Sequence, residues 1–153
     1  MKKMIVITLV CLSFISKGQI LVIDAGEGWK PKVDSALTVI RTHDTHSYEN
    51  LVRYCKEIGY WNGDYSTTEE GSKIIISRKE MNNKSINNIA CVLVHESRHL
   101  MIERANPKWD ENFIEFMCYD YEFNFARKIP NIENWLIQHI ISMREKYLNI
   151  IQG

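Results

Sequence analysis

Residues 86–104 read INNIACVLVHESRHLMIER, and Pro107 follows three residues later. The apolar residues of this stretch recur with a helical period, and no proline interrupts it, so it predicts one long helix that ends before Pro107. His95 and His99 are four residues apart, so both imidazoles lie on one face of that helix and can reach the same ion. Glu96 follows the first histidine, where its carboxylate can approach a metal-bound water without binding the metal. The pattern His-Glu-x-x-His therefore predicts a metal site with Glu96 placed to accept a proton.

A catalytic zinc site needs a third protein ligand and an open coordination position. The six residues after His99 contain no glycine and no third histidine, so we expect a carboxylate to complete the site. Glu103 lies on the same helix, and three ligands in one straight stripe do not converge well on one ion. The next predicted helix offers a stripe of glutamates, of which Glu115 is one candidate ligand. Glu111 and Glu122 share this stripe and stay open as alternatives.

Two cysteines lie close to these positions along the chain. Cys91 is one turn before His95, and Cys118 is one turn after Glu115. If the two helices pack together, the thiols can approach each other or the metal, so a disulfide and a thiolate ligand are both open. We expect instead that both cysteines are small buried residues and that glutamate is the third ligand.

The sequence His-Glu-x-x-His, followed on a second helix by Glu-x-x and a small residue, resembles the gluzincin branch of the zincin metallopeptidases, the thermolysin-like architecture. The resemblance covers about residues 73–129. It implies a zincin-like fold in which Glu96 is the general base. It also implies that three residues bind Zn²⁺, namely His95, His99 and Glu115. The chain is also similar to small exported bacterial zinc peptidases that carry a Glu-x-x-Cys or Glu-x-x-Ala pattern.

The resemblance has two further implications outside the metal ligands. The strand around Ile74 to Ile76 would be the edge strand that binds an extended substrate. Family members often have an aspartate one turn after the third ligand, where it supports a ligand histidine. This chain has Tyr119 there and Asp120 next to it, so the partner that orients the histidines stays unassigned.

The rest of the chain predicts an α+β fold in which helices dominate. Two N-terminal helices, a small sheet, the active-site helix, the glutamate helix and a C-terminal helix are expected in one domain, residues 19–153. The first two helices are expected at 33–40 and 48–58, and Gly59 stops the second. A turn at Asn62-Gly63, a polar loop at 67–71 and a strand at 73–77 follow. Asp110 is expected to cap a helix that runs to about Lys128, and Asn131 to cap a last helix whose apolar stripe reaches Tyr147.

The N-terminus has the features of a secretory signal peptide. Lys2 and Lys3 precede 13 uncharged residues, 4–16, a stretch too short for a membrane-spanning helix of about 20 residues. We expect residues 1–18 to be a signal peptide, so that the protein is exported, periplasmic or secreted, without stable membrane insertion after signal removal.

The charge balance limits the class of partner. The chain has 19 basic and 19 acidic residues, and removal of residues 1–18 would leave a net charge of −3. Nucleic-acid-binding domains usually have a strong basic surplus, so we expect no nucleic acid partner. A peptide or protein substrate is expected, and the oligomeric state is left open.

Several other residues have both a functional and a structural interpretation. His43 and His46 can form a second metal site, but a loop in which Asp44, Thr45 or Ser47 caps the next helix is favoured. Three residues are alternative oxyanion donors for which ordinary packing is the default: His139, Tyr119 and Tyr121.

Two further interpretations of the whole chain stay open beside the zinc peptidase. The domain can bear zinc without catalysis, or it can be a metal-free helical domain in which the two histidines only pack. In either case the protein would act as a binding or structural module.

Overall fold

The computed structural model describes residues 20–23, 28–83, 85–105 and 108–153. Helices dominate and accompany a small four-stranded sheet, so the predicted α+β class is confirmed. The predicted signal peptide lies outside the described residues, and no helix within them is long and apolar enough to cross a membrane. In chain order the elements are β1 (Leu21–Val22), α1 (Trp29–His43), α2 (Thr45–Tyr54), β2 (Glu57–Trp61), β3 (Thr67–Glu69), β4 (Lys73–Ser77), α3 (Arg78–Asn82), α4 (Ile86–Ala105), α5 (Glu111–Ala126) and α6 (Asn134–Gln152).

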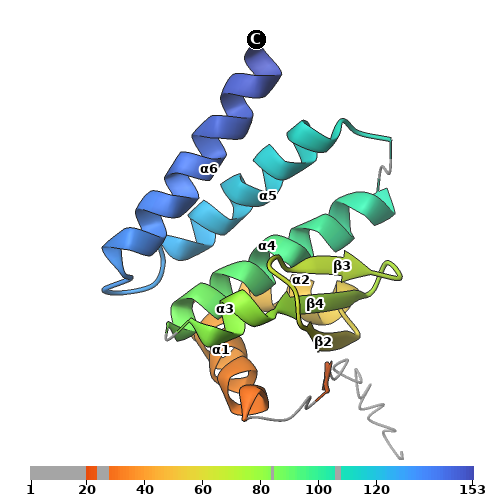
Figure 1. The fold of residues 1–153 in the computed structure, drawn as a ribbon, viewed down its shortest axis with the longest axis vertical. Coiled ribbons are helices and arrows are strands. Elements are labelled where there is room, and N and C mark those ends of the chain that lie inside the picture. Colours follow the sequence, from red (N-terminus) through yellow and green to blue (C-terminus); the bar gives the residue numbers. More distant parts are fainter. Residues whose placement is uncertain (1–19, 24–27, 84, 106–107) are drawn as a thin grey trace, which may run out of the picture.

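Helix α4, which contains the His-Glu-x-x-His motif, is the central element of the fold (Figure 1). It packs against α1, α2 and strands β3 and β4 on one side and against α5 on the other, while α6 packs on α5. A helix surrounded in this way is apolar on most of its faces, and residues such as Ile89, Leu93 and Leu100 are fully buried. The motif is thus held by the best-packed helix of the molecule.

The sheet corrects two expectations about the strands. Its order is β1-β2-β4-β3, with β1, β2 and β4 parallel and β3 antiparallel to β4. Residues 73–77 form a strand as predicted, but Ile74 to Ile76 lie in an internal strand, so they are not the edge that could bind a substrate. The edge beside α4 is β3, in the stretch 67–71 that we expected to be a polar loop. Among the described strands, this one pairs along one edge only and its residues are mostly half-exposed, so polar residues are tolerated there. For that reason its composition resembles that of a loop.

The second helix is shorter than its apolar spacing predicts. It ends at Tyr54, and Ile58 and Gly59 belong to β2. Ile58 is apolar because it is fully buried in the sheet, and its distance from Leu51 along the chain happens to match helical spacing. A Cβ at Gly59 would lie 2.9 Å from Ile75 Cδ1, so glycine here serves close strand packing and does not stop a helix.

The caps of the last two helices differ in outcome. Asp110 caps α5 as predicted, accepting hydrogen bonds from the backbone N–H groups of Asn112 and Phe113. Asn131 does not cap α6, which begins at Asn134 with Glu133 in the capping position. Asn131 has φ +55°, a left-handed conformation that asparagine tolerates in turns. Asparagine at this position therefore indicates a turn and not a helix cap.

Candidate metal centre

One stripe of α4 faces a pocket of about 610 Å³. The other walls come from strand β3 with the residues just before it, and from helices α3, α5 and α6. The positions on α4 recur at helical spacing, so a single face of the helix supplies all of them. They are Asn88, Val92, His95, Glu96, His99 and Glu103.

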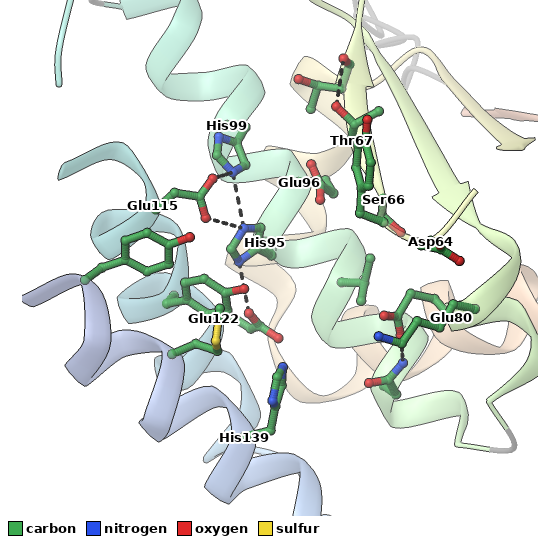
Figure 2. A pocket seen from close by; sticks show the side chains of 18 of the residues that line it. Asp64, Ser66, Thr67, Glu80, His95, Glu96, His99, Glu115, Glu122 and His139 are labelled. Carbon is green, nitrogen blue, oxygen red and sulfur yellow. Dashed lines mark hydrogen bonds and ion pairs between the residues drawn. The ribbon is translucent and has the colours of Figure 1, made fainter. Parts of the chain in front are cut away.

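The two histidines and Glu115 bring three donor atoms together in this pocket (Figure 2). His95 Nε2 and His99 Nε2 are 3.2 Å apart. Glu115 reaches across from α5 and places its carboxylate oxygens 3.2 Å from His99 Nε2 and 3.7 Å from His95 Nε2. Donor atoms around a tetrahedral Zn²⁺ with bonds of about 2.0–2.1 Å are about 3.3–3.4 Å apart. The distances from His99 Nε2 to His95 Nε2 and to Glu115 Oε1 are close to this spacing, and the third distance joins His95 Nε2 to the other carboxylate oxygen, Oε2. The two imidazoles and the carboxylate are therefore near enough to bind one small ion.

Cys118 forms a second possible donor set with the same histidines. One ligand atom from each of His95, His99 and Cys118 lies within 4.8 Å of the others, so this group could hold a metal ion. Cys118 is fully buried and is not part of the pocket wall, whereas Glu115 is. Burial raises the pKa of the Cys118 thiol, and the nearby charge of Glu115 adds to that effect. The thiol thus lies behind the donors that face the pocket.

Glu122 is the orienting partner that the sequence left unassigned. His95 Nδ1 donates a hydrogen bond of 3.0 Å to Glu122 Oε2, and the Glu122 side chain is almost completely buried. A carboxylate at this nitrogen fixes the proton on Nδ1 and leaves Nε2 free to bind a metal. Glu122 was open as a third ligand and is placed instead behind His95. Its signal in the sequence was its position two turns after Glu115 on the same stripe.

Glu96 is 7% exposed and contributes to the pocket wall. It points from α4 toward the side on which Ser66 and Thr67 lie, away from Glu115 (Figure 2). Within the described residues, no hydrogen bond to its carboxylate is present. Burial raises the pKa of Glu96, and electrostatic attraction to His95 and His99 only partly opposes this effect. A free carboxylate of raised pKa that faces a pocket is suited to accept a proton.

The carboxylates make the site favourable for positive charge. Burial lowers the pKa of His95, but the hydrogen bonds to Glu115 and Glu122 outweigh it and raise that pKa to about 10. Burial raises the pKa of Glu115, but the hydrogen bonds from the two histidines outweigh it and lower that pKa to about 2. Without a metal, protonation of His95 supplies the positive charge that balances Glu115 and Glu122.

Two of the three candidate oxyanion donors line the pocket. Tyr119 packs edge-to-face on the His95 ring at 4.4 Å and stacks on Tyr147, and burial raises the pKa of its hydroxyl, so it stays protonated at neutral pH. His139 lines the pocket from α6. Tyr121 does not, because its hydroxyl accepts hydrogen bonds from Ser47 and Asn50 in a structural network.

The other predicted ligand candidates lie away from the donor atoms. Glu111 and Glu103 line the pocket, and Glu103 accepts a hydrogen bond from Thr68. His43 and His46 are not part of the group of His95, His99 and Cys118, the one set in the described part of the chain whose ligand atoms all lie within 4.8 Å of one another. Asp44 caps α2, which agrees with the favoured interpretation of that loop. Three cysteines of the described residues are free and buried, namely Cys55, Cys91 and Cys118, so no disulfide joins them.

Comparisons of the chain with family models, with curated proteins and with solved structures give no match.

Proposed function

We propose that the protein is a zinc-dependent, peptidase-like hydrolase, with His95, His99 and Glu115 as ligands and Glu96 as general base. The observation that carries the proposal is that the two imidazole nitrogens lie 3.2 Å apart and the two oxygens of Glu115 lie 3.2 and 3.7 Å from them, at the wall of an open pocket. Two helices supply them, and a buried carboxylate orients one of them. This is the donor set of a catalytic zinc site, with three protein ligands and room for a fourth.

Zn²⁺ in this site would polarise a carbonyl oxygen and lower the pKa of a bound water toward about 7. Glu96 would accept the proton of that water, since it faces the pocket beside the proposed ligands and has no competing partner among the described residues. Glu122 holds the His95 ring in place. Tyr119 and His139 present polar hydrogens to the same pocket, where a developing oxyanion needs donors.

The edge of β3 is suited to hold the substrate. Residues Thr67 and Thr68 line the pocket, and among the described strands β3 pairs only with β4. Its free edge can therefore form main-chain hydrogen bonds with an extended peptide. A peptide or protein substrate outside the cell accords with the predicted signal peptide.

The change Glu96→Gln tests the proposal. The amide keeps the shape of the side chain but cannot take the proton, so zinc content should stay at one per chain while peptide hydrolysis falls at least about 100-fold. Metal analysis and turnover of a peptide library measure the two effects. Glu49→Gln, an exposed change away from the pocket, is the matched control. Full turnover by the Glu96 variant would remove Glu96 as the base.

The position of Cys118 favours a second candidate function. If its thiolate joined the two histidines and Glu115, four protein ligands would close the coordination shell and the metal would be structural. The protein would then be a zinc-bearing binding module without catalysis.

The changes Cys118→Ala and Glu115→Ala distinguish the two candidates. For the open catalytic site we expect Cys118→Ala to bind zinc as the wild type does and Glu115→Ala to bind it much more weakly. Competition with a chelator of known affinity measures both. Strong loss of zinc from both variants would favour the closed site.

A further inference from the structure

The pocket wall is more acidic than the metal centre requires. Seven carboxylates line it against one lysine, Lys79. Three of the seven are the base, the third ligand and the orienting residue described above. A divalent ion and Lys79 together would still leave a formal excess of four negative charges. The chain as a whole has equal numbers of acidic and basic residues, so the excess reflects where the charges are placed. The four carboxylates without a role in the metal centre are Asp64, Glu80, Glu103 and Glu111.

These four carboxylates have no basic partner among the described residues. Glu80 and Glu103 accept hydrogen bonds from neutral groups, the Asn88 amide and the Thr68 hydroxyl. No ion pair with lysine or arginine involves any of the four in the part of the chain that the structure describes. Elsewhere, acidic side chains of the fold do pair with such cations; these are Asp34, Asp44, Glu57 and Asp120. Exposed carboxylates elsewhere, such as Glu49 and Glu145, also lack a lysine or arginine partner among the described residues, so what distinguishes these four is that they line one pocket together.

The carboxylates are spread along an elongated surface. Asn88 and Glu103 both line the pocket, and the fifteen helical steps from one to the other on α4 span about 22 Å. Glu80 lies at the Asn88 end, to which it is hydrogen-bonded, and Glu103 lies at the other. An extended peptide of about six or seven residues has this length, at about 3.3 Å per residue. Charge at both ends of the pocket can thus contact side chains on both sides of a bond placed near Glu96.

Glu96 is an independent sign that a ligand with hydrogen-bond donors enters here. Its side chain is more than nine-tenths buried, faces the pocket and has no partner among the described residues. Its carboxylate can therefore accept a hydrogen bond from a ligand or from that ligand's water.

We propose that the pocket selects a basic substrate, a peptide with ammonium or guanidinium groups near the bond to be cleaved. This inference rests on the proposed hydrolytic function and names its substrate class. A concave wall of one sign concentrates ligands of the opposite sign, and carboxylates bind guanidinium groups through paired hydrogen bonds. The cationic group can be a lysine or arginine side chain or a free amino terminus, and an acidic peptide would be repelled.

The experiment uses the zinc-loaded chain and labelled peptides of one length. One peptide carries lysine and arginine, the second replaces them with norleucine and citrulline, and the third replaces them with glutamate. Each is made with a free and with an acetylated amino terminus, which separates side-chain from terminal recognition. Cleavage is followed as kcat/KM, and binding is followed independently by fluorescence anisotropy at two salt concentrations.

The double variant Glu103→Gln, Glu111→Gln removes two charges at one end of the pocket. Both side chains are exposed, so the fold should be kept, and a melting curve checks this. We expect binding and kcat/KM for the basic peptide to fall about tenfold with little change for the neutral one. The double variant Glu49→Gln, Glu145→Gln has the same charge change at exposed positions that do not line the pocket, and it should behave as the wild type.

The outcomes separate this inference from the proposed function. Cleavage of all three peptides at equal rates, with equal salt dependence, would overturn the basic preference and leave the hydrolase standing. Selective binding of the basic peptide without cleavage of any peptide would support the preference and argue against hydrolysis. If the basic peptide is neither bound nor cleaved, the inferred basic preference is overturned.

Discussion

At the residue scale, the hydrogen bond between His95 and Glu122 links the metal centre to the core. Removing a residue that orients a ligand histidine typically weakens metal binding by about 10- to 100-fold. We therefore expect Glu122→Ala to weaken zinc binding by about this factor. Glu122→Gln should lose less, because its amide oxygen still accepts the His95 Nδ1 proton. Chelator competition gives the affinities.

The control for this prediction is Asn124→Ala, two residues further along α5 on its exposed side. It should bind zinc as the wild type does. If Glu122→Ala also kept wild-type affinity, Glu122 would be only a buried neighbour of His95.

At the element scale, Asp44 joins α2 to the chain just after α5. Its carboxylate caps α2 by accepting hydrogen bonds from the backbone N–H and the hydroxyl of Ser47. It also forms an ion pair with Lys128, with 2.7 Å between Nζ and Oδ2. Burial raises the pKa of Asp44, but the bonds from Lys128 and Ser47 outweigh it, so the pKa lies below its ordinary value. The folded state therefore gains stability from the ionised form at neutral pH, and this gain is lost as the pH falls through the folded-state pKa.

We expect Asp44→Asn to lower the free energy of unfolding by about 1–2 kcal/mol at pH 7, the size of a lost cap. The difference from the wild type should shrink below about pH 4, as Asp44 itself becomes protonated. Urea unfolding of both proteins from pH 7 to pH 3 measures it. Asp34→Asn, which removes an exposed i, i+4 pair with Lys30, should cost no more than about 0.5 kcal/mol. A constant difference at all pH values would mean that the charge of Asp44 contributes nothing.

The elements also show which parts of the structure the sequence predicts and why. The motif helix was predictable because His95, Glu96 and His99 depend only on helical spacing within one segment. Strand β3 was not, because its half-exposed residues are polar and, among the described strands, it pairs only with β4. The end of α2 was not, because Ile58 is buried by pairing with Ile74, sixteen residues further along the chain. The same applies to Glu122, whose partner is 27 residues away and depends on how α5 packs on α4.

At the scale of the whole molecule, the proposed ligands connect two parts of the fold. His95 and His99 belong to the central helix α4, which packs on α1, α2 and the sheet, while Glu115 belongs to α5, which carries α6 (Figure 1). An ion bound by all three would hold these parts together and would be released on unfolding, so it must stabilise the folded state by linkage.

Zinc at 100 times its dissociation constant should then add about 2.7 kcal/mol to the free energy of unfolding. For a chain of 153 residues this corresponds to a rise in Tm of about 5–10 °C, since each kcal/mol is worth about 2–4 °C at this size. Melting curves with zinc, with magnesium and after chelation measure the effect, and His99→Ala is the variant in which zinc should no longer raise Tm. Equal melting temperatures for the zinc-loaded and chelated wild type would favour the metal-free helical module, because histidines that only pack have no ion to lose.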